Sequence, residues 1–313
     1  MKKLNYILKR LLQLVPVVLG VTILLFFVMR AIPGDPAVIR LGIRATEEGV
    51  RNLRREMGLD KPLPVQYLIF LRDVVTLDLG TSIMYEYPVK RLILERLPKT
   101  LYLAGYATLL SVLITVPMAL LAAMNKDRWP DQLIRGGFML ALGMPQFWVG
   151  VILLMIFALR IRLFPVSGFG ETPIEHLRHM TLPAVALALQ QSSWLMRSLR
   201  SDIIDVIRAD YVDFARAKGL RERLVMTKHI LRNALIPTVT ILGLNIGYLV
   251  GGSIVIERVF AIPGMGSLLL NSIFSRDYTV VEGITLSFAA MVILINLLTD
   301  LVYSVLDPRV TLD

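Results

Sequence analysis

The sequence predicts an all-α polytopic membrane protein with six transmembrane helices and a small extracytoplasmic subdomain after the first helix. Two observations predict this class. The 313-residue chain is 55% hydrophobic and only 19% charged, whereas soluble domains average about 25% charged residues. Its apolar residues also form continuous runs of about 20 residues, the length that a helix needs to cross a bilayer.

Helices are the default for these runs, because a segment in lipid must satisfy all its backbone groups internally. We expect the first run to be a retained span and not a cleaved signal peptide, since it exceeds the usual hydrophobic region and no small-x-small site follows. The predicted spans cover residues 11–32, 101–124, 137–159, 181–197, 234–256 and 283–306.

The fourth span is short and polar for a lipid-facing helix. Gln190, Gln191, Ser192 and Ser193 interrupt it. Polar side chains at membrane depth usually face the bundle interior or a cavity. We therefore expect neighbouring helices to shield this span.

The distribution of Lys and Arg predicts the orientation of the chain. Segments on the side of the termini carry seventeen of these residues, and the short loops on the other side carry five. Both termini should therefore be cytoplasmic. The predicted parts are 1–32 with the first span, an extracytoplasmic subdomain at 33–99, and a core at 100–313 with a cytoplasmic loop at 198–233. This topology also explains the net charge of +10 without nucleic acid as a partner.

Several chemistries find no support in the sequence. The chain has no cysteine, which excludes disulfides and thiolate metal sites. His176 and His179 are spaced i, i+3, but a polar interfacial segment is favoured over a metal pair. No phosphate-binding loop or hydrolase signature occurs. We therefore expect a chain that is not an enzyme and binds no metal.

The cytoplasmic loop predicts two helices joined by a glycine corner. Residues 208–218 are charged and amphipathic, Gly219 suits a helix C-terminus, and a second helix can run over 220–233 before Pro237 opens or kinks the fifth span. Apolar residues of this elbow need a cover, which either lipid or a protein partner could supply. They are Phe214, Leu220, Leu224 and Val225.

This loop resembles the "EAA" loop of binding-protein-dependent ABC importer permeases, in which a Glu-Ala-Ala triplet precedes a glycine and a proline closes the segment. Here the triplet reads Asp213-Phe214-Ala215, followed by Gly219 and by Leu235-Ile236-Pro237. Asp replaces Glu, Phe replaces the first Ala, and the gap from glycine to proline is longer. The motif that begins at Tyr211 reads Tyr-Val-x-x-Ala-Arg-Ala-Lys-Gly-Leu. It is similar to the motif found in the dipeptide/oligopeptide/nickel branch of these permeases.

The resemblance extends over essentially the whole chain and is to the B-type permease of that branch. Its motifs occur in order along the sequence, and together they are specific. They are Pro-Gly-Asp-Pro at 33–36, Leu-Gly-Thr-Ser at 79–82, Gly-Met-Pro-Gln-Phe at 143–147, the Gly-Gly-Ser segment at 251–266, Arg-Asp-Tyr at 276–278 and the ending at 296–309.

The resemblance implies a type I ABC importer permease fold and a set of partners. A second homologous permease would complete the pore, two cytosolic ATP-binding subunits would use ATP and Mg, and an extracytoplasmic binding protein would deliver the solute. The chain itself would bind no cofactor and would lie in the plasma (inner) membrane of a bacterium or archaeon. Di- or oligopeptides are the expected solutes; glutathione, nickel complexes and oligosaccharides are alternatives.

The resemblance also implies that the elbow sits in a cleft of an ATPase subunit. An exposed ion pair adds only about 0.2–1 kcal/mol, so apolar contacts should carry most of the docking. The predicted coupling residues are Asp213, Phe214, Ala215, Ala217, Gly219, Leu220 and Leu224.

Weaker candidates lie in or near the spans. Gly243, Gly247 and Gly251 have the small-xxx-small spacing that lets helices approach closely, either at the interface with the second permease or within the chain. Pro145 should kink the third span, as a gate element or, as we favour, for packing. Glu257 either caps the outer mouth of the pore or is an adjacent surface charge.

Two other classes remain as rivals. A secondary transporter, working without ATP, predicts inverted repeats and broken helices near the midplane, and the sequence shows no repeat. An intramembrane enzyme predicts paired catalytic groups at membrane depth, which the sequence also lacks.

Overall fold

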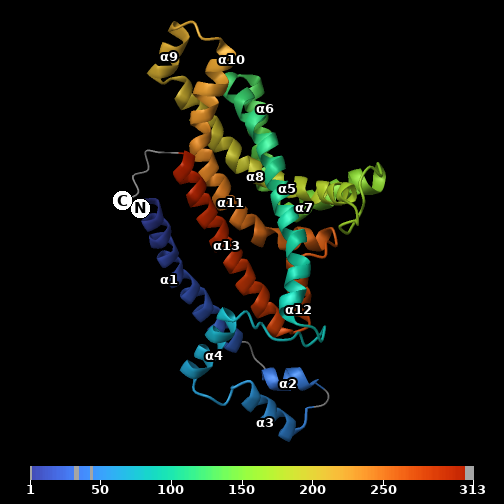
Figure 1. Ribbon diagram of the computed structural model, residues 1–313. Helices are drawn as coiled ribbons and strands as arrows, with labels where there is room; N and C mark the ends of the chain where they lie inside the picture. The colour runs from blue at the N-terminus through green and yellow to red at the C-terminus, as the bar shows by residue number, and fades with distance from the viewer. Residues whose placement is uncertain (1, 32–34, 43–44, 307–313) are drawn as a thin grey trace. The chain divides into compact units, whose positions relative to one another are not determined.

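The computed structural model describes residues 2–31, 35–42 and 45–306 (Figure 1). Within these residues the secondary structure is helical, with a single isolated β-bridge between Thr81 and Pro88. The all-α prediction is therefore confirmed. The chain forms two compact units. The first comprises Met1–Pro98 and Ser267–Ile293, and the second comprises Lys99–Gly266 and Leu294–Asp313.

The first unit is built on a long helix and three shorter ones. Helix α4 packs on α1 through Tyr67 and Phe70, whose ring centroids lie 5.3 and 5.9 Å from that of Phe26. The Thr22 hydroxyl and the Tyr67 hydroxyl are also 3.0 Å apart. The bounds are α1 Lys2–Ala31, α2 Pro36–Leu41, α3 Glu47–Glu56 and α4 Leu63–Val75, together with the start of α5 Val89–Met124 (as far as Pro98), most of α12 Met265–Phe274 and the first part of α13 Tyr278–Leu306.

Two sequence motifs that are far apart in the chain meet in the first unit. The Ser82 hydroxyl donates to Oδ2 of Asp277 at 2.5 Å, and the Met84 amide donates to the same oxygen at 3.1 Å. Oδ1 of Asp277 accepts from the amide of Val280 in the first turn of α13. Asp277 therefore starts α13 and holds the 79–82 motif against it.

The second unit packs its helices around α8. Helices α6, α7 and α11 all contact α8, and a core that includes Leu187, Ile256 and Phe260 fills the space between them. The bounds are α5 Val89–Met124 (from Lys99 onward), α6 Trp129–Gly143, α7 Gln146–Leu153, the π-helix η2 Leu154–Arg160, α8 Pro173–Ile207, α9 Asp210–Ala217, α10 Glu222–Leu224, the π-helix η3 Val225–Leu231 and α11 Arg232–Val259.

Three helical segments of the described chain are long and apolar enough to cross a membrane: Val89–Met124, Glu222–Leu249 and Tyr278–Thr299. A fourth candidate is the pair Trp129–Gly143 and Gln146–Arg160, which is bent by 105°. The described apolar part of α1 is shorter, and α8 is long enough but too polar. The count of six spans therefore stays a prediction, although the multi-span membrane fold is confirmed.

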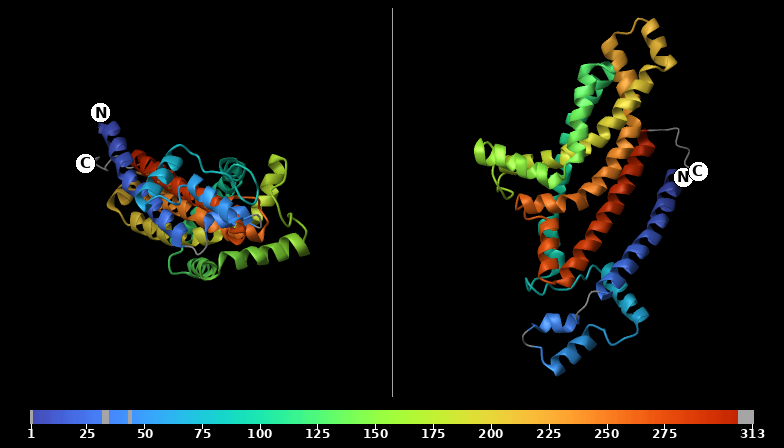
Figure 2. Two further views of the ribbon diagram at one scale, coloured as in Figure 1. Left: turned by 90° about the horizontal axis from the view of Figure 1, so that it is seen from below. Right: turned by 180° about the vertical axis from the view of Figure 1, so that it is seen from behind.

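The predicted kink at Pro145 is present. Helix α6 ends at Gly143 and α7 begins at Gln146, and the chain turns through 105° between them. Pro145 has φ −59° and ψ 136°, an extended conformation that cannot continue a helix. The break is visible from behind in Figure 2, and it brings Gln146 to the first turn of α7.

Candidate functional site

The elbow is a helix–glycine–helix corner beyond the ends of α8 and α11 (Figure 1). Helix α9 ends at Ala217, and Gly219 follows with φ +76°. The Gly219 amide donates to the carbonyl of Arg216 at 2.9 Å, and the Leu220 amide donates to that of Ala215 at 3.3 Å. A Cβ at Gly219 would meet open space, so glycine is required here for its left-handed conformation and not for its size.

An apolar core fixes the elbow to the rest of the second unit. Val212 and Ala215 of α9 pack with Val225 and Ile230 of η3, and all four side chains are buried. The expectation that Val225 is an exposed contact residue is wrong: its side chain is fully buried, because Val225 follows the exposed Leu224 by one residue and therefore lies on a different face of the helix, in the core with α9. The core also includes Ala119 and Ala123 of α5, Leu199 and Ile203 of α8 and Ala234 of α11.

The opposite face of the elbow exposes apolar side chains. The Phe214 side chain is 61% exposed, and Leu220 and Leu224 are also exposed. The ammonium of Lys218 lies 4.5 Å from the centre of the Phe214 ring. Six of the seven predicted coupling residues are exposed; only Ala215 is buried in the core described above. Together, Asp213, Phe214, Ala217, Leu220 and Leu224 form the elbow face.

A salt bridge closes the corner on which the elbow face is built. Arg216 donates two hydrogen bonds to the Glu222 carboxylate, at 2.8 and 3.2 Å, and so joins α9 to α10 across Gly219. This hydrogen bonding raises the pKa of Arg216 above its ordinary value. Asp213 lies 3.6 Å from the same guanidinium, and its side chain is largely exposed. A basic group of a partner would therefore compete with Arg216 for Asp213.

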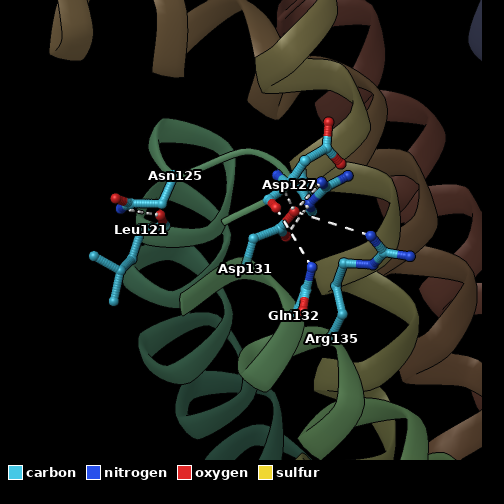
Figure 3. Close-up of polar contacts among 7 residues, drawn as sticks. Leu121, Asn125, Asp127, Asp131, Gln132 and Arg135 are labelled. Carbon is cyan, nitrogen blue, oxygen red and sulfur yellow. Dashed lines mark hydrogen bonds and ion pairs between the residues drawn. The ribbon is translucent and has the colours of Figure 1, made fainter. Parts of the chain in front are cut away.

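A buried ion pair, which sequence reasoning missed, supports the same end of the unit (Figure 3). The fully buried carboxylate of Asp131 on α6 accepts from Nε and Nη2 of Arg200 on α8, at 2.7 and 2.5 Å. It also accepts from the amide of Asp127 at 2.9 Å, and Arg135 lies 3.9 Å away. The pair ties the turn between α5 and α6 to α8.

Glu257 is fully buried, so its interpretation as a surface charge is wrong. Its carboxylate accepts a hydrogen bond from the Thr100 hydroxyl at 2.7 Å, and the Ser253 hydroxyl lies at 3.5 Å. A Cβ at Gly264 or at Gly266 would lie 3.0 Å or less from this carboxylate. The glycines of the Pro-Gly-Met-Gly turn therefore make room for Glu257.

The three glycines of α11 have different surroundings. A Cβ at Gly243 would overlap Thr299 of α13, so this glycine serves close packing within the chain. Gly247 is buried. Gly251 is exposed and faces open space, so it alone of the three is open to another chain.

Polar side chains line a cavity of about 460 Å³ in the second unit. The Gln146 side chain donates a hydrogen bond to Gln190 across it. Gln191 is only 4% exposed, and neither amide atom has a hydrogen-bond partner among the described residues. Leaving a buried polar group unpaired costs about 1–3 kcal/mol. The lining residues are Leu142, Gln146, Gln190, Gln191, Trp194, Asn245, Tyr248 and Leu249.

The histidines have structural surroundings. The His176 ring stacks on Phe169 with 4.0 Å between centroids, and Nδ1 of His179 donates to the carbonyl of Ser167 at 2.8 Å. In the described part of the chain, no group of three or more His, Asp or Glu residues could hold a metal ion.

Comparison with known proteins identifies the family. The model described as "Binding-protein-dependent transport system inner membrane component" matches residues 115–312. The model for the N-terminal part of such membrane components matches residues 3–104. The two matches together cover nearly all of the chain.

Curated relatives match at full length. The chain is 39% identical to a putative peptide transport system permease protein of Brucella abortus, over 98% of this chain and 99% of the relative. It is also 39% identical to the oligopeptide transport system permease protein AppB of Bacillus subtilis, over 97% and 98%. A third relative is the glutathione transport system permease protein GsiC of Pectobacterium atrosepticum, at 39% over 98% and 99%.

Solved structures show the same fold at low sequence identity. The inward-facing MetNI methionine ABC transporter superposes with a TM-score of 0.60 at 15% identity, covering 70% of this chain and 98% of that one. An amino acid ABC transporter superposes with a TM-score of 0.51 at 17% identity, covering 71% and 95%. The chain therefore belongs to the family of inner-membrane components of binding-protein-dependent transport systems, and it is a pore-forming permease subunit of an ABC importer.

Proposed function

We propose that this permease forms, with a second homologous permease subunit, a pore that imports di- or oligopeptides. Two cytosolic subunits hydrolyse ATP with Mg, an extracytoplasmic binding protein delivers the solute, and this chain neither binds a cofactor nor catalyses a reaction. The names of the relatives support the solute class, because they include peptide, oligopeptide and glutathione permeases. Glutathione, itself a tripeptide, is the second candidate.

The single observation that carries the coupling role is the construction of the elbow. Its inner side is a packed core shared with α5, α8 and α11, while its outer side exposes Phe214, Leu220 and Leu224. Exposed apolar patches on a firmly held support are typical of protein–protein interaction sites. Because the core joins the elbow to α5, α8 and α11, a movement of the elbow face would be passed directly to these three long helices. We therefore assign the elbow face to the ATPase subunit.

The coupling role is tested by co-purification of the assembled importer in mild detergent. We expect Phe214→Asp to lose the ATPase subunits, because a carboxylate would have to be buried in an apolar interface without a partner. Phe274→Asp is the matched control, since Phe274 is also highly exposed but lies on α12 in the other unit. Equal retention of the ATPase by both variants would refute the role of the elbow.

The orientation belongs to the same proposal. The protein lies in the plasma (inner) membrane of a bacterium or archaeon with both termini in the cytoplasm, so that the basic elbow meets the cytosolic ATPases. A reporter fused after Asp313 should be cytoplasmic, and one inserted near Thr46 should be extracytoplasmic. The reverse pattern would contradict the orientation.

The solute class is tested separately from the coupling. Purification of the cognate binding protein with its natural ligand, followed by mass spectrometry, should identify a peptide. Recovery of a nickel complex or an oligosaccharide would replace peptides as the solute without affecting the role of the elbow.

A further inference from the structure

The 460 Å³ cavity lies between α6, α7, α8 and α11, and the chemistry of its lining is that of a ligand site and not of a packing defect. Its volume lies within the range of ordinary ligand pockets, about 300–1,000 Å³. We infer that it is a solute-contact site, in which side-chain amides hydrogen-bond to the peptide bonds of a solute in transit. This inference rests on the proposed import of peptides.

The chemistry of the lining favours peptide bonds. Gln146, Gln190, Gln191 and Asn245 each carry an amide group, and an amide both donates and accepts hydrogen bonds. They therefore match the N–H and C=O groups that every peptide bond presents. No charged side chain is among the described residues of this lining, so the site makes no demand on the charge of the solute. Such a lining tolerates many peptide sequences.

The state of the amides shows unused hydrogen-bonding capacity. The bond from Nε2 of Gln146 to Oε1 of Gln190 uses one donor and one acceptor of this pair. Both amide atoms of Gln191 are buried and have no partner within the described chain. Buried polar groups in native proteins are nearly always paired. A peptide entering the cavity would supply the missing partners after a small rotation of the Gln191 side chain.

Two aromatic side chains complete the site. Trp194 on α8 and Tyr248 on α11 line the cavity and are each more than half exposed. Such rings offer a large apolar surface together with a polar edge, and they lose little conformational entropy on binding. They would contact the side chains of a peptide while the amides hold its backbone.

The cavity of about 390 Å³ in the first unit differs, because Arg30, Asp73 and Glu282 give it a charged lining.

The first test uses the complete importer in proteoliposomes with its binding protein, and radiolabelled tri-alanine as the probe. Gln191→Leu and Gln190→Leu should each lower tri-alanine uptake per ATP hydrolysed about fivefold to tenfold, the loss of about one net hydrogen bond. Gln132→Leu is the matched control, since Gln132 lies on α6 outside the cavity; it should stay within twofold of wild type. Uptake ratios in both cavity variants equal to the control would overturn the inference.

The second test detects the contact directly and does not depend on the rate of uptake. The chain has no cysteine, so Asn245→Cys introduces a single thiol. An Ala-Cys-Ala probe activated as a 2-pyridyl disulfide should be trapped at this position during ATP turnover, by exchange that releases pyridine-2-thione. Leu244→Cys is the neighbouring control, exposed but not part of the lining.

The outcomes separate the two proposals. Trapping at position 245 that exceeds trapping at 244 supports the solute-contact site. Three results would overturn this inference and leave the proposed function standing, provided that the wild-type importer takes up tri-alanine. They are no trapping, equal trapping at both positions, and cross-linking of position 245 to the partner permease without trapping of the probe. Failure of the wild-type importer to take up any peptide overturns the proposed function and this inference with it.

Discussion

The elbow and the polar cavity lie in the same unit, but they lack different kinds of contact: the elbow leaves apolar side chains uncovered, and the cavity leaves amide groups without hydrogen bonds. The elbow has a fully packed interior and exposes apolar side chains outward. The cavity is lined mainly by amide and aromatic side chains, and its wall holds a glutamine whose buried amide atoms have no partner in the described chain. An exposed apolar face calls for a lasting protein partner, whereas unpaired amides suit a polar ligand that comes and goes. The difference separates the part that receives force from the part that meets the solute.

The largest effect should come from the support of the elbow. Asp131→Ala leaves the guanidinium of Arg200, which is mostly buried, without its carboxylate. Breaking a buried pair in this way costs about 3–5 kcal/mol. Thermal unfolding of the purified subunit in mild detergent should therefore shift strongly downward. Asp213→Ala is the control, because this carboxylate is largely exposed. An equal drop in the unfolding temperature of both variants would show that the buried pair stabilises the subunit no more than an exposed one.

In the cavity, by contrast, a substitution is expected to raise the stability of the subunit. Gln191→Leu replaces an unpaired amide with an apolar side chain of similar size, so the isolated subunit should gain about 1–3 kcal/mol of stability. Denaturation followed by tryptophan fluorescence in detergent would measure it. A loss of stability would mean that the amide of Gln191 already has a structural partner. A variant that is more stable but transports less would separate the two regions most clearly.

A smaller effect is expected at the corner of the elbow. Gly219→Ala places a side chain at φ +76°, which costs roughly 1–2 kcal/mol even though the surrounding space is open. Gly251→Ala is the counterpart, at an open helical site in α11, where alanine should stabilise slightly. Thermal midpoints of the two variants should move in opposite directions. Midpoints that both rise would show that the corner relaxes without strain.

Much of the fold could be predicted from local patterns. Continuous apolar runs identified the helices that contain Val89–Met124 and Tyr278–Thr299, Pro145 marked the break between α6 and α7, and Gly219 marked the corner of the elbow. Each of these signals lies within a few residues of the structure that it determines. The polar residues 190–193 indicated a shielded helix, and two of them line the cavity.

The missed features depend on partners that are distant in sequence. Asp131 and Arg200 are 69 positions apart, and Thr100 and Glu257 are 157 apart. No local sequence pattern predicts either pair. The burial of Val225 is of the same kind, because its side chain lies in a core shared with residues of α5 and α8, which are distant in sequence. The number of spans also depends on tertiary shielding, since α8 contains the predicted span 181–197 but is not apolar enough by itself to show that it crosses the membrane.

The most direct test of the account asks what covers the elbow face. Because this chain has no cysteine, Phe214→Cys places a single spin label on it, and labelling the variant before the other subunits are added keeps the label unique in the reconstituted importer. With the ATPases bound, the label should be immobilised and shielded from both lipid-soluble oxygen and an aqueous nickel chelate, and removal of the ATPases should restore its mobility and exposure. Oxygen accessibility that is high and unchanged by the ATPases would show that the elbow rests on lipid, and it would contradict the coupling role.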